Sequence, residues 1–178
     1  MTNLTRRELL RNGFGAAGVV GASLLLGRWA LSQPGASPPA HRFPVMKTEA
    51  QWKKILTPAQ YHILRQSGTD APYSGQYEAK EKGIYKCVAC DNPLYSTETE
   101  FDSGTGWPSF WQPLTKNSIV KQSDTSLLME RTEIVCARCG SHLGHVFPDG
   151  PKPTGQRYCI NSVSVELQVS AVPEEPQN

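Results

Sequence analysis

The sequence predicts a mainly β domain preceded by one or two short helices, and three observations lead to this fold class. The 14 prolines and 15 glycines favour many turns over long helices. Short runs rich in β-branched and aromatic residues alternate with turn residues beyond residue 75. Two Cys-x-x-Cys pairs, separated by 45 residues, would tie distant strands together if they share an ion. At 178 residues the chain has the length of one folded domain with a leader segment.

The first 32 residues have the three-part plan of an export signal. Arg6 and Arg7 precede a Gly/Ala-rich apolar run at residues 14–26, and small residues follow near Ser32. The arginine pair resembles a twin-arginine signal, so we expect an exported, periplasmic protein. The apolar run is shorter than the roughly 20 residues that span a membrane, but an uncleaved signal would leave the protein membrane-anchored.

The rest of the chain divides into a linker, one domain and a tail. Residues 33–46 are rich in Pro and Ala, as in a flexible linker, residues 47–170 form the domain, and residues 171–178 form a flexible tail. Without residues 1–32, Lys and Arg fall from 18 to 14 and Asp and Glu from 16 to 15, which leaves a net charge of −1. Nucleic-acid binding requires a clustered basic face, so we expect no nucleic-acid partner, and we expect a monomer.

Two helices should open the domain. They are expected at residues 49–56 and 58–66. Thr57 suits the N-cap of the second helix, Pro58 suits its first position, and Gln60 completes a capping box. Gly68 ends this helix. Strands are then expected at residues 83–88, 110–114, 118–121, 127–136, 142–147 and 158–169.

The two cysteine pairs are Cys87 with Cys90 and Cys136 with Cys139, and each places two thiolates on one tight turn. Four thiolates satisfy the tetrahedral geometry of Zn²⁺ and leave no position open for chemistry. We therefore predict one structural zinc ion per chain. Three alternatives remain open: two disulfides, a redox-active Cys-x-x-Cys, and a Cys2His2 site formed by Cys136, Cys139, His142 and His145.

Cys159 is the one cysteine outside these pairs. If residues 157–167 form a single strand, its period of two places Arg157, Cys159 and Asn161 on one face. The apolar residues that would continue this face into the core are Val163, Val165 and Leu167. A lone free cysteine is commonly buried and inert, but the neighbouring Arg157 would favour the thiolate, which is the reactive form.

His142 and His145 stand three residues apart beside the second cysteine pair. In a regular strand they would point to opposite faces, but a bulge at Gly144 would bring them together. Two of only four histidines at this place favour a functional role. The glycine-rich segment at residues 101–111 also carries aromatic residues, which by themselves indicate only core packing.

Together these segments resemble the B-type peptide-methionine sulfoxide reductases, which act on the R epimer of methionine sulfoxide in oxidised proteins. The resemblance spans about residues 47–169. It is carried by both cysteine pairs and by residues 65–69, 72–75, 106–110, 142–150 and 157–162. The resemblance implies a fold of two antiparallel sheets, often called a β-tent, with the zinc ion distant from the reaction.

The resemblance also implies the catalytic residues. Cys159 would attack the sulfoxide sulfur. His145 and His142, with Asn161 and bound water, would supply a proton to the departing oxygen. These roles suit the residue types, because imidazole donates protons near neutral pH and a thiolate is a strong nucleophile.

Other residues would surround the substrate. Trp107 would contact its methyl group. The remaining implied residues are Phe147, in the same pocket, and Asp149 and Arg157, which would tune the charge around the thiolate. Many family members carry a resolving cysteine where this chain has Thr105. We therefore expect an external thiol, such as a thioredoxin-like protein, to reduce the sulfenic acid of the enzyme.

Two other functions remain open. A cysteine hydrolase would use Cys159, His145 and Asn161 as nucleophile, base and orienting group, but it gives no role to Trp107. A zinc-stabilised β module could bind a partner without any catalysis, and it would not need a reactive thiol.

Overall fold

The computed structural model describes residues 43–75, 81–126 and 129–169. The predicted signal, most of the predicted linker and the predicted tail lie outside the described residues. Among the residues that are described, no helix has the length and apolar content needed to cross a bilayer.

Two short helices open the domain, α1 (Glu49–Ile55) and α2 (Pro58–Gln66). Each begins with a complete capping box, formed by Thr48 with Gln51 and by Thr57 with Gln60. The predicted bounds of the second helix are confirmed. The first helix ends one residue earlier than predicted, because Leu56 adopts an extended backbone as its C-cap.

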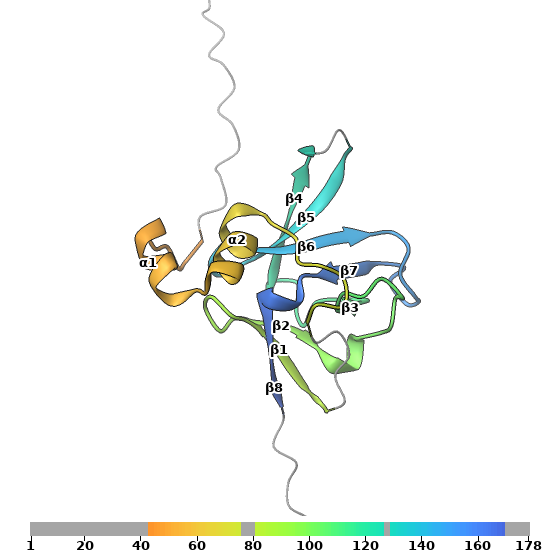
Figure 1. The fold of residues 1–178 in the computed structure, drawn as a ribbon. Coiled ribbons are helices and arrows are strands. Elements are labelled where there is room, and N and C mark those ends of the chain that lie inside the picture. The colour runs from red at the N-terminus through yellow and green to blue at the C-terminus, as the bar shows by residue number, and fades with distance from the viewer. Residues whose placement is uncertain (1–42, 76–80, 127–128, 170–178) are drawn as a thin grey trace, which may run out of the picture. The chain divides into compact units, whose positions relative to one another are not determined.

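The strands form two antiparallel sheets, as predicted, and a mainly β fold is confirmed (Figure 1). The three-stranded sheet has the order β2-β1-β8 and the five-stranded sheet has the order β3-β7-β6-β5-β4. The strand bounds are β1 (Gly83–Cys87), β2 (Pro93–Ser96), β3 (Ser109–Phe110), β4 (Ile119–Asp124), β5 (Arg131–Cys136), β6 (His142–Phe147), β7 (Arg157–Ile160) and β8 (Val165–Val169). The 3-10 turns that lie wholly within the described residues are η1 (Thr97–Thr99) and η3 (Ser162–Ser164).

The single strand predicted at residues 158–169 is wrong. β7 and β8 belong to different sheets, and η3 separates them. Asn161 leaves the strand, and its carbonyl accepts a hydrogen bond from the Ser164 amide at 3.0 Å. The period of two therefore stops at Asn161, so the face of Cys159 does not continue through Val163.

Other strand boundaries also differ from the prediction. The strand expected at residues 110–114 is limited to Ser109–Phe110, and β2 was not predicted because it is only four residues long and starts with Pro93. The strand predicted at residues 118–121 extends to Asp124. Of the strand predicted at residues 127–136, the described part is β5, while residues 127–128 lie outside the described residues.

Aromatic side chains fill the core. Phe110 stacks on Tyr95 with ring centroids 4.4 Å apart, and Tyr85 meets Phe110 edge-on at 5.1 Å. All three are almost completely buried. Helix α2 packs against β6 and η3, which fixes the two segments that flank the pocket described next.

Candidate active site

Cys159 occupies the centre of three paired strands in the five-stranded sheet. It lies opposite His145 across the β6–β7 pair and opposite Ser109 across the β3–β7 pair. Because directly opposite residues in antiparallel strands have Cβ atoms about 4.5–5.5 Å apart, the sheet register places an imidazole and a hydroxyl residue beside the thiol.

A bulge in β6 brings the two histidines together. The β5–β6 register moves from Ile134 opposite Gly144 to Val135 opposite His142, so one residue of β6 has no partner. Gly144 has a φ of 155°, and a Cβ built there would lie 2.1 Å from the Cys159 carbonyl oxygen. The rings of His142 and His145 have centroids 5.5 Å apart. The predicted bulge and the convergence of the two rings are both confirmed.

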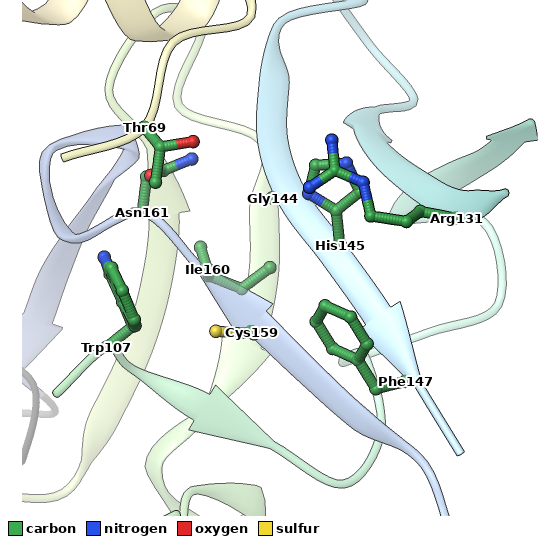
Figure 2. A pocket seen from close by; sticks show the side chains of 9 residues that line it. All are labelled: Thr69, Trp107, Arg131, Gly144, His145, Phe147, Cys159, Ile160 and Asn161. Carbon is green, nitrogen blue, oxygen red and sulfur yellow. The ribbon is translucent and has the colours of Figure 1, made fainter. Parts of the chain in front are cut away.

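A small pocket of about 180 Å³ opens over Cys159. Figure 2 shows the sulfur of Cys159 between Trp107 and Phe147, with Asn161 on one side and His145 on the other. The lining residues are Thr69, Trp107, Arg131, Gly144, His145, Phe147, Cys159, Ile160 and Asn161. Five of the predicted site residues thus share one cavity, which offers an apolar wall, a thiol, an imidazole and an amide.

A second, polar pocket of about 390 Å³ adjoins the first and shares Thr69, Arg131 and His145 with it. His142 lines this second pocket and not the pocket over Cys159. The remaining lining residues are Ser67, Asp124, Ser126 and Glu133. His145 therefore faces both pockets, whereas His142 faces only the second.

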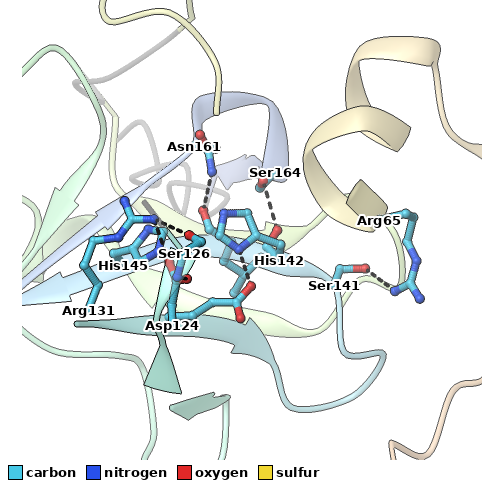
Figure 3. A network of polar contacts seen from close by, with 11 residues as sticks. Arg65, Asp124, Ser126, Arg131, Ser141, His142, His145, Asn161 and Ser164 are labelled. Carbon is cyan, nitrogen blue, oxygen red and sulfur yellow. Dashed lines mark hydrogen bonds and ion pairs between the residues drawn. The ribbon is translucent and has the colours of Figure 1, made fainter. Parts of the chain in front are cut away.

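Each histidine is paired with a carboxylate that the sequence did not identify (Figure 3). His142 Nδ1 lies 2.6 Å from Glu133 Oε1, and His145 Nε2 lies 2.8 Å from Asp124 Oδ2. Arg131 also bonds Asp124 Oδ2, at 2.6 Å. In the described part of the structure, His142 Nε2 is buried without a hydrogen-bond partner. This nitrogen therefore has an unused hydrogen-bonding position.

Opposing effects set the protonation of these groups. Burial lowers the pKa of His145, although the hydrogen bond that His145 donates to Asp124 acts in the opposite direction. Hydrogen bonds from Ser126 and His145 hold the pKa of Asp124 far below its usual value. Asp124 is therefore an anion at neutral pH, and its charge favours the protonated form of His145.

Arg157 and Asp149 form a bidentate ion pair beside the thiol. Arg157 Nε donates to Asp149 Oδ1 at 3.0 Å, and the second nitrogen donates to Oδ2 at 2.8 Å. The guanidinium also lies over the Phe147 ring, 4.5 Å from its centroid. Neither residue lines the thiol pocket, although the charge of Arg157 acts on the Cys159 thiol.

Arg157 favours the thiolate of Cys159, as expected, but burial outweighs its effect. Burial is the largest effect and raises the pKa of the Cys159 thiol, while the charge of Arg157 and a hydrogen bond with Thr105 lower it by less. The charge of Asp70 raises it further. Burial thus opposes formation of the thiolate.

Asp70 organises the pocket, and sequence reasoning missed it. Trp107 Nε1 donates to Asp70 Oδ1 at 2.7 Å, and the Asp70 amide donates to Asn161 Oδ1 at 3.1 Å. Ser162 Oγ and the Val163 amide donate to Asp70 Oδ2 at 2.7 and 3.2 Å. A carboxylate in the short gap between the matched stretches 65–69 and 72–75 was the available signal. Thr69 and Ile160 stand in matched stretches but received no role, and Arg131 was missed because only the folded chain brings it to the cavity.

The four remaining cysteines converge on one point, as predicted for a metal site. The Sγ atoms of Cys87, Cys90, Cys136 and Cys139 all lie within 4.8 Å of one another. The two shortest contacts between pairs are 3.8 and 3.6 Å, and a tetrahedron with Zn–S bonds of about 2.3 Å has edges of about 3.8 Å. No disulfide joins any of the five cysteines.

Two alternatives for these cysteines are therefore wrong. The spacing of the sulfur atoms is far longer than a disulfide bond of about 2.05 Å, and the Cys2His2 set does not form, since both histidines bond to carboxylates instead. β1 ends at Cys87 and β5 ends at Cys136, so the cluster joins the two sheets.

Comparison with known proteins agrees with this geometry. The model of the SelR domain family matches residues 56–169. The peptide methionine sulfoxide reductase MsrB of Methanosarcina barkeri is 58% identical over 125 residues, which cover 70% of this chain and 88% of the relative. The protein of the same name from Pseudomonas savastanoi is 55% identical over 124 residues, which cover 69% of this chain and 95% of the relative. This chain belongs to the SelR domain family, the family of the MsrB peptide methionine sulfoxide reductases.

Proposed function

We propose that this chain reduces methionine-R-sulfoxide in oxidised proteins back to methionine, with Cys159 as the nucleophile. The observation that carries the proposal is the place of the Cys159 sulfur, which lies outside the four-cysteine cluster and inside a small pocket between Trp107 and Phe147. The relatives named as methionine sulfoxide reductases support the same activity. A binding module without catalysis would have no use for this thiol.

The reaction transfers one oxygen atom and two electrons. The Cys159 thiolate attacks the sulfoxide sulfur while a proton passes from an imidazole to the sulfoxide oxygen. The oxygen ends on Cys159 as a sulfenic acid, and the substrate leaves as a thioether that has gained the two electrons lost by Cys159. The charge of Asp124 stabilises the imidazolium form of His145 that this step requires.

The pocket suits a methyl sulfoxide. Trp107 and Phe147 provide apolar surface for the methyl group, while His145 and Asn161 provide polar contacts for the oxygen. Asn161 is held by its own hydrogen bond from Nδ2 to the Leu143 carbonyl at 3.1 Å. Because the apolar and polar walls are fixed, only one epimer can place its methyl group and oxygen correctly at the same time.

Reduction of the sulfenic acid requires two thiols from outside the chain. A first thiol forms a mixed disulfide with Cys159 and releases water, and a second thiol breaks that disulfide and restores the Cys159 thiol. The other four cysteines are gathered in the metal cluster, and Thr105 cannot form a disulfide. A thioredoxin-like protein has the required chemistry. Trapping of a Cys159 sulfenic acid with dimedone, without an internal disulfide, would support this route.

We infer that the ion held by the cysteine cluster is zinc and that its role is structural. All four ligands are thiolates from this chain, which suits Zn²⁺ and leaves no place for a substrate. The Cys136 and Cys139 turn is fixed by the Gly140 amide, which donates to the Cys136 carbonyl at 2.8 Å. When bound, the ion would supply folding energy and no reaction chemistry.

We also propose export to the periplasm as a monomer, with residues 1–32 as a twin-arginine-like signal. The support is the pattern of Arg6, Arg7 and the apolar run that follows. Replacement of both arginines by lysine should leave the protein in the cytoplasmic fraction. Retention in the membrane fraction of the unaltered protein would instead identify the signal as an anchor.

The decisive experiment offers the protein the separate R and S epimers of a methionine-sulfoxide peptide with dithiothreitol. We expect reduction of the R epimer alone, and no reduction by Cys159→Ser. Cys159→Ser should retain its metal and its fold, because Cys159 is not in the cysteine cluster. Turnover of neither epimer by the unaltered protein would contradict the proposal, and hydrolysis of a peptide bond without reductant would indicate a cysteine hydrolase.

A further inference from the structure

Thr105 stands in a turn that is held from several sides. Gly104 and Gly106, on either side of it, have positive φ values of 69° and 83°. The Gly104 amide donates to Asp102 Oδ1 at 2.7 Å. Tyr73 binds the same turn twice, since its amide donates to the Gly106 carbonyl at 2.7 Å and its hydroxyl donates to the Gly104 carbonyl at 3.1 Å. The position of Thr105 is therefore fixed by its surroundings.

Thr105 is also one end of a chain of three hydroxyl groups. Ser103 Oγ lies 2.7 Å from Thr105 Oγ1 and 2.8 Å from Ser109 Oγ. Ser109 is completely buried and is the residue directly opposite Cys159 across the β3–β7 pair. At the other end of the chain, Thr105 acts on Cys159, since its hydroxyl is one of the groups that lower the pKa of that thiol.

The geometry points to Thr105 as a further catalytic residue, whose hydroxyl, backed by Ser103 and Ser109, donates a hydrogen bond to the Cys159 sulfur and stabilises its thiolate. This role of Thr105 deepens the proposed function. It rests on that function only where it predicts an effect on the rate of catalysis. Thr105 would thus have a function at the position where the chain lacks a resolving cysteine.

The proton arrangement of the chain can follow the state of the sulfur. When Cys159 is a thiol, it can donate to Thr105. Thr105 then donates to Ser103 and Ser103 to Ser109, and Ser109 Oγ donates to the Trp107 carbonyl at 3.1 Å. When Cys159 is a thiolate, rotation of the three hydroxyls lets Ser109 donate to Ser103, Ser103 to Thr105, and Thr105 to the sulfur. The rotation moves no proton between atoms, so the thiol proton leaves by another route, towards solvent or His145.

Such a donor matters because the thiol is buried. Burial raises the pKa of Cys159, and the hydrogen bond from Thr105 is one of the contacts that lower it. Aligned hydroxyls polarise one another, so the bond that reaches the sulfur is stronger than that of an isolated hydroxyl. Replacement of the Thr105 hydroxyl by a methyl group or a hydrogen atom would leave the Cys159 thiolate without this donor.

The test measures thiolate formation directly, without substrate. The rate of Cys159 alkylation by iodoacetamide is followed from pH 6 to pH 10 in the metal-loaded protein by mass spectrometry of the Cys159 peptide. We expect Thr105→Val and Thr105→Ala to move the midpoint up by about one pH unit, which slows alkylation about tenfold at neutral pH. Thr105→Ser keeps the hydroxyl and should keep the midpoint. Two different hydroxyl-free variants are used so that a folding defect in one leaves the other comparison intact.

The matched control is Thr115→Val. Thr115 is an exposed threonine whose hydroxyl contacts Ser118 at 3.0 Å and makes no contact with Cys159, so its loss should not change the midpoint. Ser103→Ala interrupts the chain behind Thr105 and should give a smaller upward shift. An unchanged alkylation profile in both Thr105→Val and Thr105→Ala would overturn the inference, even if the unaltered protein reduces the R epimer. Failure of the unaltered protein to reduce either epimer, with the shift present, would instead overturn the proposed function alone.

Discussion

Asp70 and Trp107 are joined by a hydrogen bond of 2.7 Å from the indole Nε1 to the carboxylate, and the second carboxylate oxygen holds Ser162 and the Val163 amide. One side chain thus connects the loop after α2, the aromatic wall of the pocket and the turn that follows Cys159 and Asn161. The aromatic wall of the pocket is therefore positioned by a side chain that does not line the pocket.

Asp70→Ala should weaken substrate binding more than it slows the chemical step. Loss of a hydrogen bond to a charged acceptor costs about 1.5–3 kcal/mol. Trp107 would keep only its 3.2 Å hydrogen bond to the Asp70 backbone carbonyl, and we expect KM to rise about tenfold with a smaller decrease in kcat. Steady-state kinetics with an R-sulfoxide peptide provide the measurement. Asp70→Asn retains a carbonyl acceptor for Trp107 and is the matched control, so equal KM values for the two variants would contradict this role.

The pH dependence of kcat/KM should show a broad plateau. The proposed reaction uses a Cys159 thiolate and a protonated imidazole, yet burial lowers the pKa of His145 below its ordinary 6.5 and raises the pKa of Cys159 above its ordinary 9.0. Below the pKa of His145 the imidazole is already charged, so the active fraction of the enzyme decreases together with the thiolate fraction as the pH falls. Above the Cys159 pKa the imidazolium fraction falls while the thiolate is complete. The rate should therefore decrease only below about pH 6.5 and above about pH 9.

Asp124→Asn should shift the acid limb of this profile to lower pH. The carboxylate raises the pKa of His145 through its hydrogen bond and its charge, so its removal lowers that pKa and reduces the imidazolium fraction on the plateau. We expect a plateau about tenfold lower, because one pKa unit corresponds to a factor of ten. An acid limb at the same pH as in the unaltered enzyme would exclude Asp124 as the charge partner of His145.

Metal removal should unfold the domain and not merely inactivate it. The cysteine cluster joins the end of β1 in one sheet to the end of β5 in the other, and four-thiolate zinc sites contribute folding free energy. Cys87→Ser, or a strong chelator, should lower the melting temperature and release one zinc ion per chain. Cys159→Ser should change neither the metal content nor the melting temperature, and a fully stable metal-free protein would contradict a structural role.

Gly144→Ala should destabilise the protein, because the new Cβ would lie 2.1 Å from the Cys159 carbonyl oxygen. We expect a loss of about 2–4 kcal/mol in the free energy of unfolding, in the range typical of severe core strain. Gly155→Ala is the control, since Gly155 also has a positive φ, 69°, but has open space around it. It should cost about 1 kcal/mol. Urea denaturation of both variants gives the comparison, and equal losses would mean that the close approach to Cys159 is unimportant.

The sequence by itself determined the features that depend on neighbouring residues or on residue type. The capping boxes at Thr48 and Thr57 start the two helices, although only the second was foreseen, and four cysteines in two tight pairs specify a metal cluster. Local chemistry is sufficient there, because the groups that interact are within a few residues of one another or share one ion.

Only the tertiary structure decided how the site works. The partners of His142 and His145 are Glu133 and Asp124, which come from other strands of the sheet, and the convergence of the two rings requires the β6 bulge. The turn at Asn161 ended a strand that alternation alone would have continued. The raised pKa of Cys159 follows from burial, which exceeds the local effect of Arg157. Such properties arise from strand register and from exclusion of water, and neither is encoded in any short segment of the chain.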